Sequence, residues 1–194
     1  MYYLDVELEG IADILFNRFS PGARKQWESG STGQKPTAKQ AQEAAEGRAY
    51  LDDTGLYLPP WTAKKVLLEG AFDGKLKINK KPLHRWLGAV AFVQGTPRFL
   101  DQKGKPVKTW DYVHEVMGRQ PPGPKGKPAL ILRPALRAGW RLTFQVAILD
   151  DVISEKAVHE AYSQAGLYVG AGGWRPEFGR FLVKSCLRLK QERK

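Results

Sequence analysis

A stretch near the C-terminus combines residue types that could hold a nucleic-acid backbone. Five glycines fall within the fourteen residues 166–179, and Trp174, Arg175 and Arg180 lie among or beside them. Glycine permits positive φ and the close approach of another chain. Guanidinium groups and an indole ring beside bare backbone amides would suit a phosphate backbone or a neighbouring subunit. The glycines that we assign to this loop are Gly170, Gly172, Gly173 and Gly179.

The familiar phosphate-binding loops do not match this stretch. A P-loop carries Lys-Ser or Lys-Thr after its glycines, and a dinucleotide fingerprint opens a helix, whereas this loop follows one. The structural alternative is a helix that stops at Gly166, followed by a tight turn in which Trp174 fills the core. The sequence leaves both interpretations open.

Basic residues gather in two windows that contain no carboxylate, residues 74–100 and 116–149. Aromatic residues lie among them, which favours phosphate neutralisation combined with stacking on bases. Together with the C-terminal loop, these windows supply the predicted nucleic-acid-binding residues. They are Lys80, Lys81, Arg85, Arg119, Lys125, Lys127, Arg133, Arg137, Arg141, Trp174, Arg175, Arg180 and Lys184.

The overall charge agrees with a polyanionic partner. The 194 residues include 31 basic and 20 acidic side chains, for a net charge of +11. The single cysteine, Cys186, excludes an internal disulfide and a multi-cysteine zinc site, and favours a reduced, cytoplasmic location. No apolar run approaches the length of a membrane span, and the start lacks a signal-peptide pattern. We predict neither a metal nor a cofactor.

Catalysis has little support in the sequence. The three histidines, His84, His114 and His159, lie in separate segments without the spacing of metal ligands. His84 lies among basic residues and is the only one that we consider as a general base acting on RNA. Asp150 and Asp151 predict a helix start rather than a metal site. Because no nucleophile motif accompanies these residues, the sequence favours a binding protein over an enzyme.

Hydrophobic patterning predicts the elements that would position these residues. Residues 2–9 alternate between apolar and polar, which predicts a half-buried strand. One amphipathic helix is predicted between Thr62 as N-cap and Gly74, and a second over residues 154–165. Further strands are predicted at 88–93, 129–135, 140–149 and 178–189. The polar stretches at about 17–53 and 94–128 are predicted insertions, the second partly disordered or a long hairpin.

Without the insertions, the order is strand, helix, strand, strand, helix, strand. This order predicts an α+β fold with a ferredoxin-like (RRM-like) βαββαβ core, in a single domain over residues 1–194. One face of such a sheet packs on the helices, while the other stays open. The residues predicted on the open face are Arg141, Thr143, Gln145, Arg180, Lys184 and Arg188.

This element order, with a glycine-rich loop before the last strand, resembles the RAMP superfamily of CRISPR systems. The resemblance rests on Gly170-Ala-Gly172-Gly173-Trp174-Arg175-Pro176 and on Gly179-Arg180-Phe181. The chain also resembles phage and prophage proteins whose C-terminal sequence is similar. In those proteins an Arg-Pro strand and a Trp-led strand precede the loop, as Arg133-Pro134 and Trp140 do here. The resemblance covers residues 129–184 well. It implies a backbone-type subunit that binds single-stranded nucleic acid along an oligomer and uses its long insertion as a clasp.

Three functional hypotheses follow. The first is a non-catalytic protein that binds single-stranded RNA or DNA and oligomerises along it. The second is a RAMP-type endoribonuclease, although the catalytic histidine of those enzymes has no counterpart at a matching position. The third is a phage protein that binds and modulates a nucleic-acid machine. The choice between RNA and DNA stays open, because it depends on contacts to the 2′-hydroxyl group.

Overall fold

The main sheet has the ferredoxin-like arrangement that the sequence predicts. The computed structural model describes residues 1–18, 37–120 and 127–189. Its four-stranded sheet has the order β5-β8-β1-β9, and every neighbouring pair is antiparallel. In chain order these strands are β1 (Tyr2–Gly10), β5 (Ala91–Leu100), β8 (Arg141–Ile148) and β9 (Phe181–Arg188). The fold is therefore α+β, as expected.

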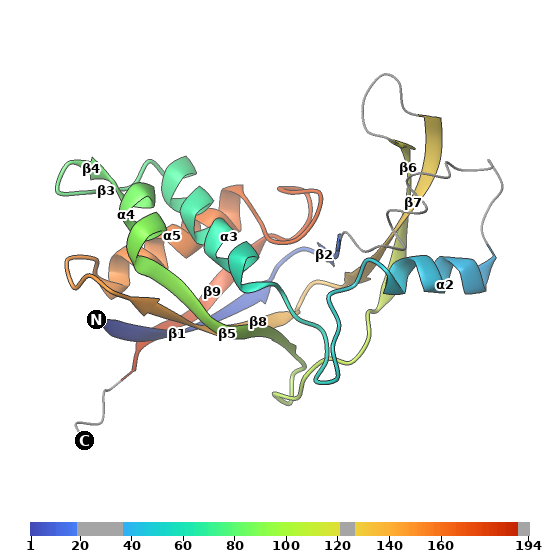
Figure 1. Cartoon of the computed structure of the whole chain (residues 1–194), viewed down its shortest axis with the longest axis horizontal. Coiled ribbons are helices and arrows are strands. Elements are labelled where there is room, and N and C mark those ends of the chain that lie inside the picture. Colours follow the sequence, from blue (N-terminus) through green and yellow to red (C-terminus); the bar gives the residue numbers. More distant parts are fainter. Residues whose placement is uncertain (19–36, 121–126, 190–194) are drawn as a thin grey trace.

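Helices cover one face of this sheet and leave the other open (Figure 1). The covering helices are α3 (Pro60–Asp73), α4 (Leu83–Val90) and α5 (Glu155–Tyr168). Alternate residues of β1, such as Leu4 and Leu8, are almost fully buried beneath them, which is the period-2 pattern of a strand with one packed face. No helix in the described ranges is long and apolar enough to cross a membrane.

One observed helix end lies where the sequence predicts it, and two lie elsewhere. Ser154 caps α5 through a hydrogen bond that its side chain accepts from the backbone N–H of Ala157. Helix α3 begins at Pro60, earlier than the predicted cap at Thr62, because proline at the first position needs no N–H partner. Gly166 does not end α5. It lies inside the helix, where an added Cβ would stand 2.1 Å from the carbonyl oxygen of Phe181.

A smaller lobe extends from one end of the main sheet (Figure 1). Its three-stranded sheet has the order β2-β7-β6, and α2 (Ala38–Glu46) packs against β7 and β6. The strands are β2 (Ile14–Leu15), β6 (Tyr112–Gln120) and β7 (Lys127–Leu136). At the opposite end of the molecule, β3 (Lys77–Ile78) and β4 (Lys81–Pro82) form a short hairpin beside α4.

The boundaries between core and insertions differ from those expected. Residues 94–100, predicted within the second insertion, belong to β5 of the main sheet. Residues 129–135, predicted as a core strand, lie in β7 and pair with β6 in the smaller lobe. The strand predicted at 88–93 starts at Ala91, because the helical spacing of Leu83 and Leu87 prevails and forms α4. In the first insertion, of which 19–36 lie outside the described residues, Ala45 and Ala49 are buried rather than peripheral.

Candidate nucleic-acid interface

The glycine-rich loop is held against the start of the smaller lobe by its own backbone. The N–H of Gly173 donates to the carbonyl of Leu15 at 2.8 Å, and the N–H of Gly179 donates to that of Asp13 at 2.7 Å. The loop also closes on itself, since the N–H of Ala171 donates to the carbonyl of Gly179 at 2.8 Å. These amides are therefore already paired, so they are not the free phosphate donors that the sequence suggested.

Two of the loop glycines are required by this closure. Gly172 and Gly179 have φ of +77° and +75°. An added Cβ would lie 2.6 Å from the carbonyl oxygen of Leu15 at Gly172, and 1.8 Å from that of Ala171 at Gly179. Both positive φ and lack of space thus select glycine. The glycine pattern specifies the shape of the loop, and the ligand-binding groups must be side chains.

Trp174 leads from this loop to the base of the β6–β7 hairpin. Its ring lies edge-on to His114 at a centroid distance of 5.7 Å, and the guanidinium carbon of Arg133 lies 4.5 Å from the ring centroid. His114 also contacts Phe178, at 5.1 Å. With 39% of its surface exposed, Trp174 is neither a buried core plug nor a free platform. We call the place where β2, the hairpin base and the glycine-rich loop meet the loop–hairpin junction.

Two buried arginines lie in this junction, and neither forms an ion pair with a carboxylate of the described residues. Arg133, on β7, is 8% exposed, and Arg48, just after α2, is 9% exposed. Within the described part of the chain, Nε and Nη1 of Arg133 and Nε of Arg48 have no hydrogen-bond partner. Arg48 Nη1 donates to Oδ1 of Asn17 at 3.1 Å. Buried charged donors without partners are costly, so the pair is suited to an incoming anion.

The electrostatics of the pair support this interpretation. Burial lowers the pKa of the Arg133 guanidinium, and the nearby positive charge of Arg48 lowers it further. Burial also lowers the pKa of Arg48. Arginine nevertheless stays protonated at neutral pH, because its unperturbed pKa is above about 12. Two like charges held together in a protected place attract a phosphate group strongly.

The base of the hairpin is fixed to the core beside this pair. Asp13 accepts a hydrogen bond from the Tyr112 hydroxyl at 2.6 Å and another from the backbone N–H of Ala138 at 2.8 Å. The guanidinium of Arg137 lies 5.3 Å from the centre of the Tyr112 ring. Three exposed arginines in these segments form no ion pair with a carboxylate of the described ranges. They are Arg18, Arg137 and Arg180.

Several other predicted binding residues are neutralised by acids. Arg175 Nη1 lies 2.6 Å from a Glu69 carboxylate oxygen, and Arg141 Nη2 lies 2.6 Å from one of Glu7. Lys184 Nζ lies 2.8 Å from a carboxylate oxygen of Glu9, and this contact raises the pKa of the lysine. Paired cations contribute less to phosphate binding than free ones, because a ligand must compete with the carboxylate.

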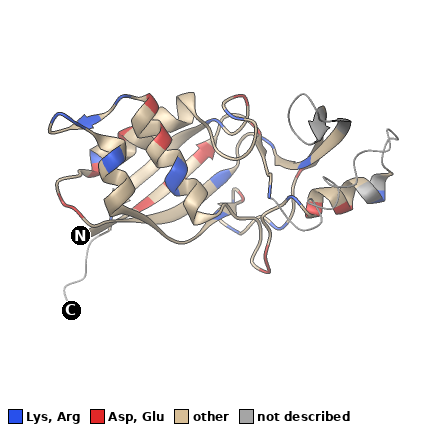
Figure 2. Ribbon diagram, turned by 45° about the horizontal axis from the view of Figure 1, so that its top comes forward, with Lys and Arg blue, Asp and Glu red and all other residues tan. Residues whose placement is uncertain are grey.

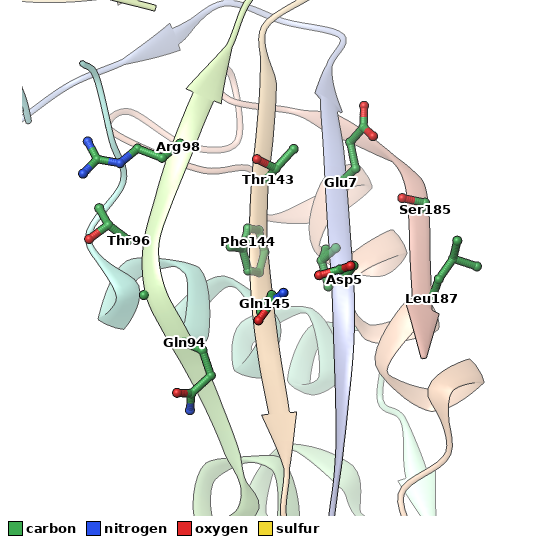
Figure 3. Close-up of a pocket in the computed structure, with 12 residues that line it drawn as sticks. Asp5, Glu7, Gln94, Thr96, Arg98, Thr143, Phe144, Gln145, Ser185 and Leu187 are labelled. Atoms are coloured by element: carbon green, nitrogen blue, oxygen red, sulfur yellow. The ribbon is translucent and has the colours of Figure 1, made fainter. Parts of the chain in front are cut away.

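The open face of the sheet is accordingly a mixed polar surface rather than a basic one. β1 contributes Asp5, Glu7 and Glu9 at its centre, and acidic positions lie beside basic ones along the main sheet (Figure 2). A shallow cavity of about 670 Å³ on this face is lined by carboxylate, amide and hydroxyl side chains, including Asp5 and Gln145 (Figure 3). Arg188 was predicted here but lies on the helix side, 4.2 Å from the ring centre of Tyr2.

The remaining predicted residues are spread over distant parts of the molecule. Lys80, Lys81 and Arg85 are exposed in or next to the β3–β4 hairpin and α4, and this hairpin lies at the end opposite the smaller lobe (Figure 1). Arg119 and Lys127 belong to β6 and β7, and Lys125 lies outside the described residues. Lys80, Lys81 and Arg85 therefore lie apart from the loop–hairpin junction.

The three histidines have separate surroundings, and His159 contacts Ser163 within α5. His84 packs edge-on to Phe72 at 5.1 Å, far along the sequence from His114, whose ring is surrounded by aromatic neighbours. Among the described residues, no group of three or more histidine, cysteine or acidic side chains could hold a metal ion. The site is therefore built from arginine and aromatic side chains.

Sequence reasoning missed Arg48 and His114 as members of the site. Arg48 lies in a polar stretch that we assigned to an insertion, and His114 lacks any neighbouring motif. No local signal identifies either residue, because both depend on contacts with Asn17, Trp174 or Phe178 from distant segments.

Comparison with known proteins gives a likeness of fold. No protein-family model matches the chain, and no curated protein matches it by sequence. Among solved structures, it is similar to a chain in a cryo-EM structure of the Type III-B Cmr-beta bound to cognate target RNA. The TM-score is 0.54 at 12% identity, over 97% of this chain and 61% of the other. The present chain thus spans about three fifths of that protein's length.

Proposed function

We propose that this protein binds single-stranded nucleic acid, RNA or single-stranded DNA, as a non-catalytic, backbone-type subunit of the RAMP kind. The observation that carries the proposal is the buried pair Arg48 and Arg133, whose guanidinium nitrogens lack partners among the described residues. These nitrogens are themselves covered, so a phosphate group would meet the pair at its more accessible guanidinium nitrogens and supply the missing negative charge. The structurally similar chain comes from a structure of the Type III-B Cmr-beta bound to cognate target RNA, which supports the same class of ligand.

The surrounding groups fit this function. The exposed residues Arg18, Arg137 and Arg180 add positive charge around the pair, and Trp174 offers a partly exposed ring beside it. Extended basic tracks with aromatic rings are the usual means of binding single strands with little sequence preference. Assembly of several copies along one strand, which the RAMP resemblance implies, would place successive junctions on successive segments of the ligand.

A salt titration tests the proposal. Fluorescence anisotropy with short labelled single strands should show binding at low salt that weakens as salt increases. If five arginines each neutralise one phosphate, the slope of log affinity against log salt is about −3.5, at about 0.7 per phosphate for single strands. Duplexes of the same sequence should bind more weakly. Absence of binding to single strands at low salt would contradict the proposal.

A further inference from the structure

A second hollow adjoins the junction on the helix side of the molecule. It is a shallow, open cleft of about 630 Å³ between the C-terminal ends of α3 and α5 and the glycine-rich loop. Phe72, Tyr168 and Trp174 line it from these three segments. The volume is in the range of small-ligand sites in proteins.

The aromatic side chains of this cleft are unusually exposed for their size. Phe72 and Tyr168 are each 62% exposed, and Trp174 is 39% exposed. Large rings on a soluble protein are normally covered, and a group of them around one hollow indicates a binding surface. The ion pair between Arg175 and Glu69 ties the loop to α3 and fixes one wall of the cleft.

The charged residues that line the cleft are Glu69, Asp73 and Arg175, so the lining carries one net negative charge. Glu69 contacts Arg175 at 2.6 Å, and Lys65, which does not line the cleft, lies 3.7 Å from the same carboxylate. Asp73 forms no ion pair within the described ranges. An aromatic cleft without excess positive charge suits a flat uncharged heterocycle better than a phosphate group.

Trp174 belongs both to this cleft and to the loop–hairpin junction. The guanidinium of Arg133 lies over its ring at 4.5 Å, while the indole also lines the cleft. We propose that the cleft is a base-binding subsite for a nucleotide adjacent to the phosphate held by Arg48 and Arg133. This inference rests on the proposed function and specifies which part of the strand lies on the helix side.

The cleft also has a means of distinguishing bases. The aromatic rings stack on any base, because every base has a π face. The free carboxylate of Asp73 accepts hydrogen bonds but cannot donate them, so it favours an exocyclic amino group such as N4 of cytosine. Uracil presents a carbonyl oxygen at the same position, which a carboxylate repels. The subsite should therefore prefer cytosine to uracil.

Homopolymers of equal length test this proposal. The wild-type protein should bind oligo(C) about fivefold more tightly than oligo(U), the lower end of the discrimination that polar base contacts provide. Asp73→Asn should abolish that preference. Tyr168→Ala should weaken binding of both oligomers by about fivefold or more, as removal of a stacking ring does. The melting temperature should not change, because the ring is largely exposed.

Leu167→Ala is the matched control. This neighbour is 52% exposed and does not line the cleft, so the variant should bind both oligomers as the wild type does. If Asp73→Asn and Tyr168→Ala bind like the wild type while salt-dependent binding persists, the base subsite is wrong and the proposed function survives. If either variant changes only self-association in light scattering, the cleft is a protein contact, which also overturns the inference. Failure of the wild type to bind any oligomer would instead contradict the proposed function.

Discussion

The open sheet face and the loop–hairpin junction both contain arginines that the sequence marked as binding residues, but their surroundings differ. On the open face, Arg141 contacts Glu7 and Lys184 contacts Glu9. In the junction, Arg48 and Arg133 are buried without a carboxylate among the described residues. The comparison shows that a large positive charge of the whole chain does not locate a binding site. The site is indicated by the positions of cations that have no carboxylate partner.

The largest expected effect is that of Arg133→Met. The variant removes a phosphate-binding group and should weaken single-strand binding by about tenfold or more, the value of a charge-assisted hydrogen bond. Its melting temperature should stay the same or rise, because an apolar side chain of similar length replaces a buried, unpaired charge. Thermal melting and anisotropy on one preparation measure both. The matched control is Arg98→Met, which breaks the ion pair with Asp52 and should keep the wild-type affinity for single strands. A lower affinity in Arg98→Met than in Arg133→Met would contradict the distinction between paired and unpaired arginines.

Arg48→Met should have a smaller effect of the same kind. Arg48 keeps one hydrogen bond to Asn17, so the substitution loses a contact as well as an unpaired charge. We expect affinity to fall by about fivefold, in the lower range for hydrogen bonds to charged groups, with little change in melting. The same titration measures it. If Arg48→Met binds single strands as the wild type does while Arg133→Met binds them more weakly, Arg133 alone forms the anion site.

Glu7→Gln should separate stability from binding on the open face. Losing the ion pair to Arg141 should lower the free energy of unfolding by about 0.2–1 kcal/mol, the range for partly exposed pairs. Affinity for single strands should stay within about twofold, since the ligand is bound elsewhere and only long-range attraction changes. Denaturant unfolding and anisotropy provide the two values. A severalfold gain in affinity at physiological salt would place the strand on the open face.

The smallest effect is expected for Glu9→Gln. The substitution removes the partner of Lys184, a lysine that is half exposed, so melting should hardly change. Affinity should increase slightly at low salt through the added net charge, and the gain should vanish near physiological salt, where the Debye length is about 8 Å. Titrations at both salt concentrations test this. A gain that persists at high salt would indicate direct contact between Lys184 and the ligand.

Much of the fold could be predicted from local patterns. The alternation of β1 and β8 and the helix expected to start at residue 154 depend on residues close in sequence, and each was confirmed. The structural role of Gly166 could not be predicted, because it reflects the distant carbonyl of Phe181. The strand over residues 129–135 was predicted, but its pairing with β6 was not. Local sequence does not show whether a strand pairs with the main sheet or with another strand, because tertiary structure decides this.

The candidate site was harder to predict than the fold. The sequence shows which residues are charged, but not which charges meet across strands. Arg141 and Glu7 are 134 positions apart, and only their side-by-side strands bring them together. Arg133 was among the predicted binding residues, whereas Arg48, which lies near it, falls in a stretch that we assigned to an insertion. Whether an arginine is buried without a carboxylate partner depends on the folded structure and cannot be read from the sequence.

The most direct test compares how salt affects two double variants that each remove two positive charges. One is Arg48→Met with Arg133→Met in the junction, and the other is Arg141→Gln with Lys184→Gln on the open face. If the strand lies at the junction, the first should reduce the log–log salt slope by about 1.4, for two phosphates at about 0.7 each, and the second should change it much less, because it alters only long-range attraction. Equal slopes in both variants, or a loss confined to the open-face variant, would contradict a binding site at the junction.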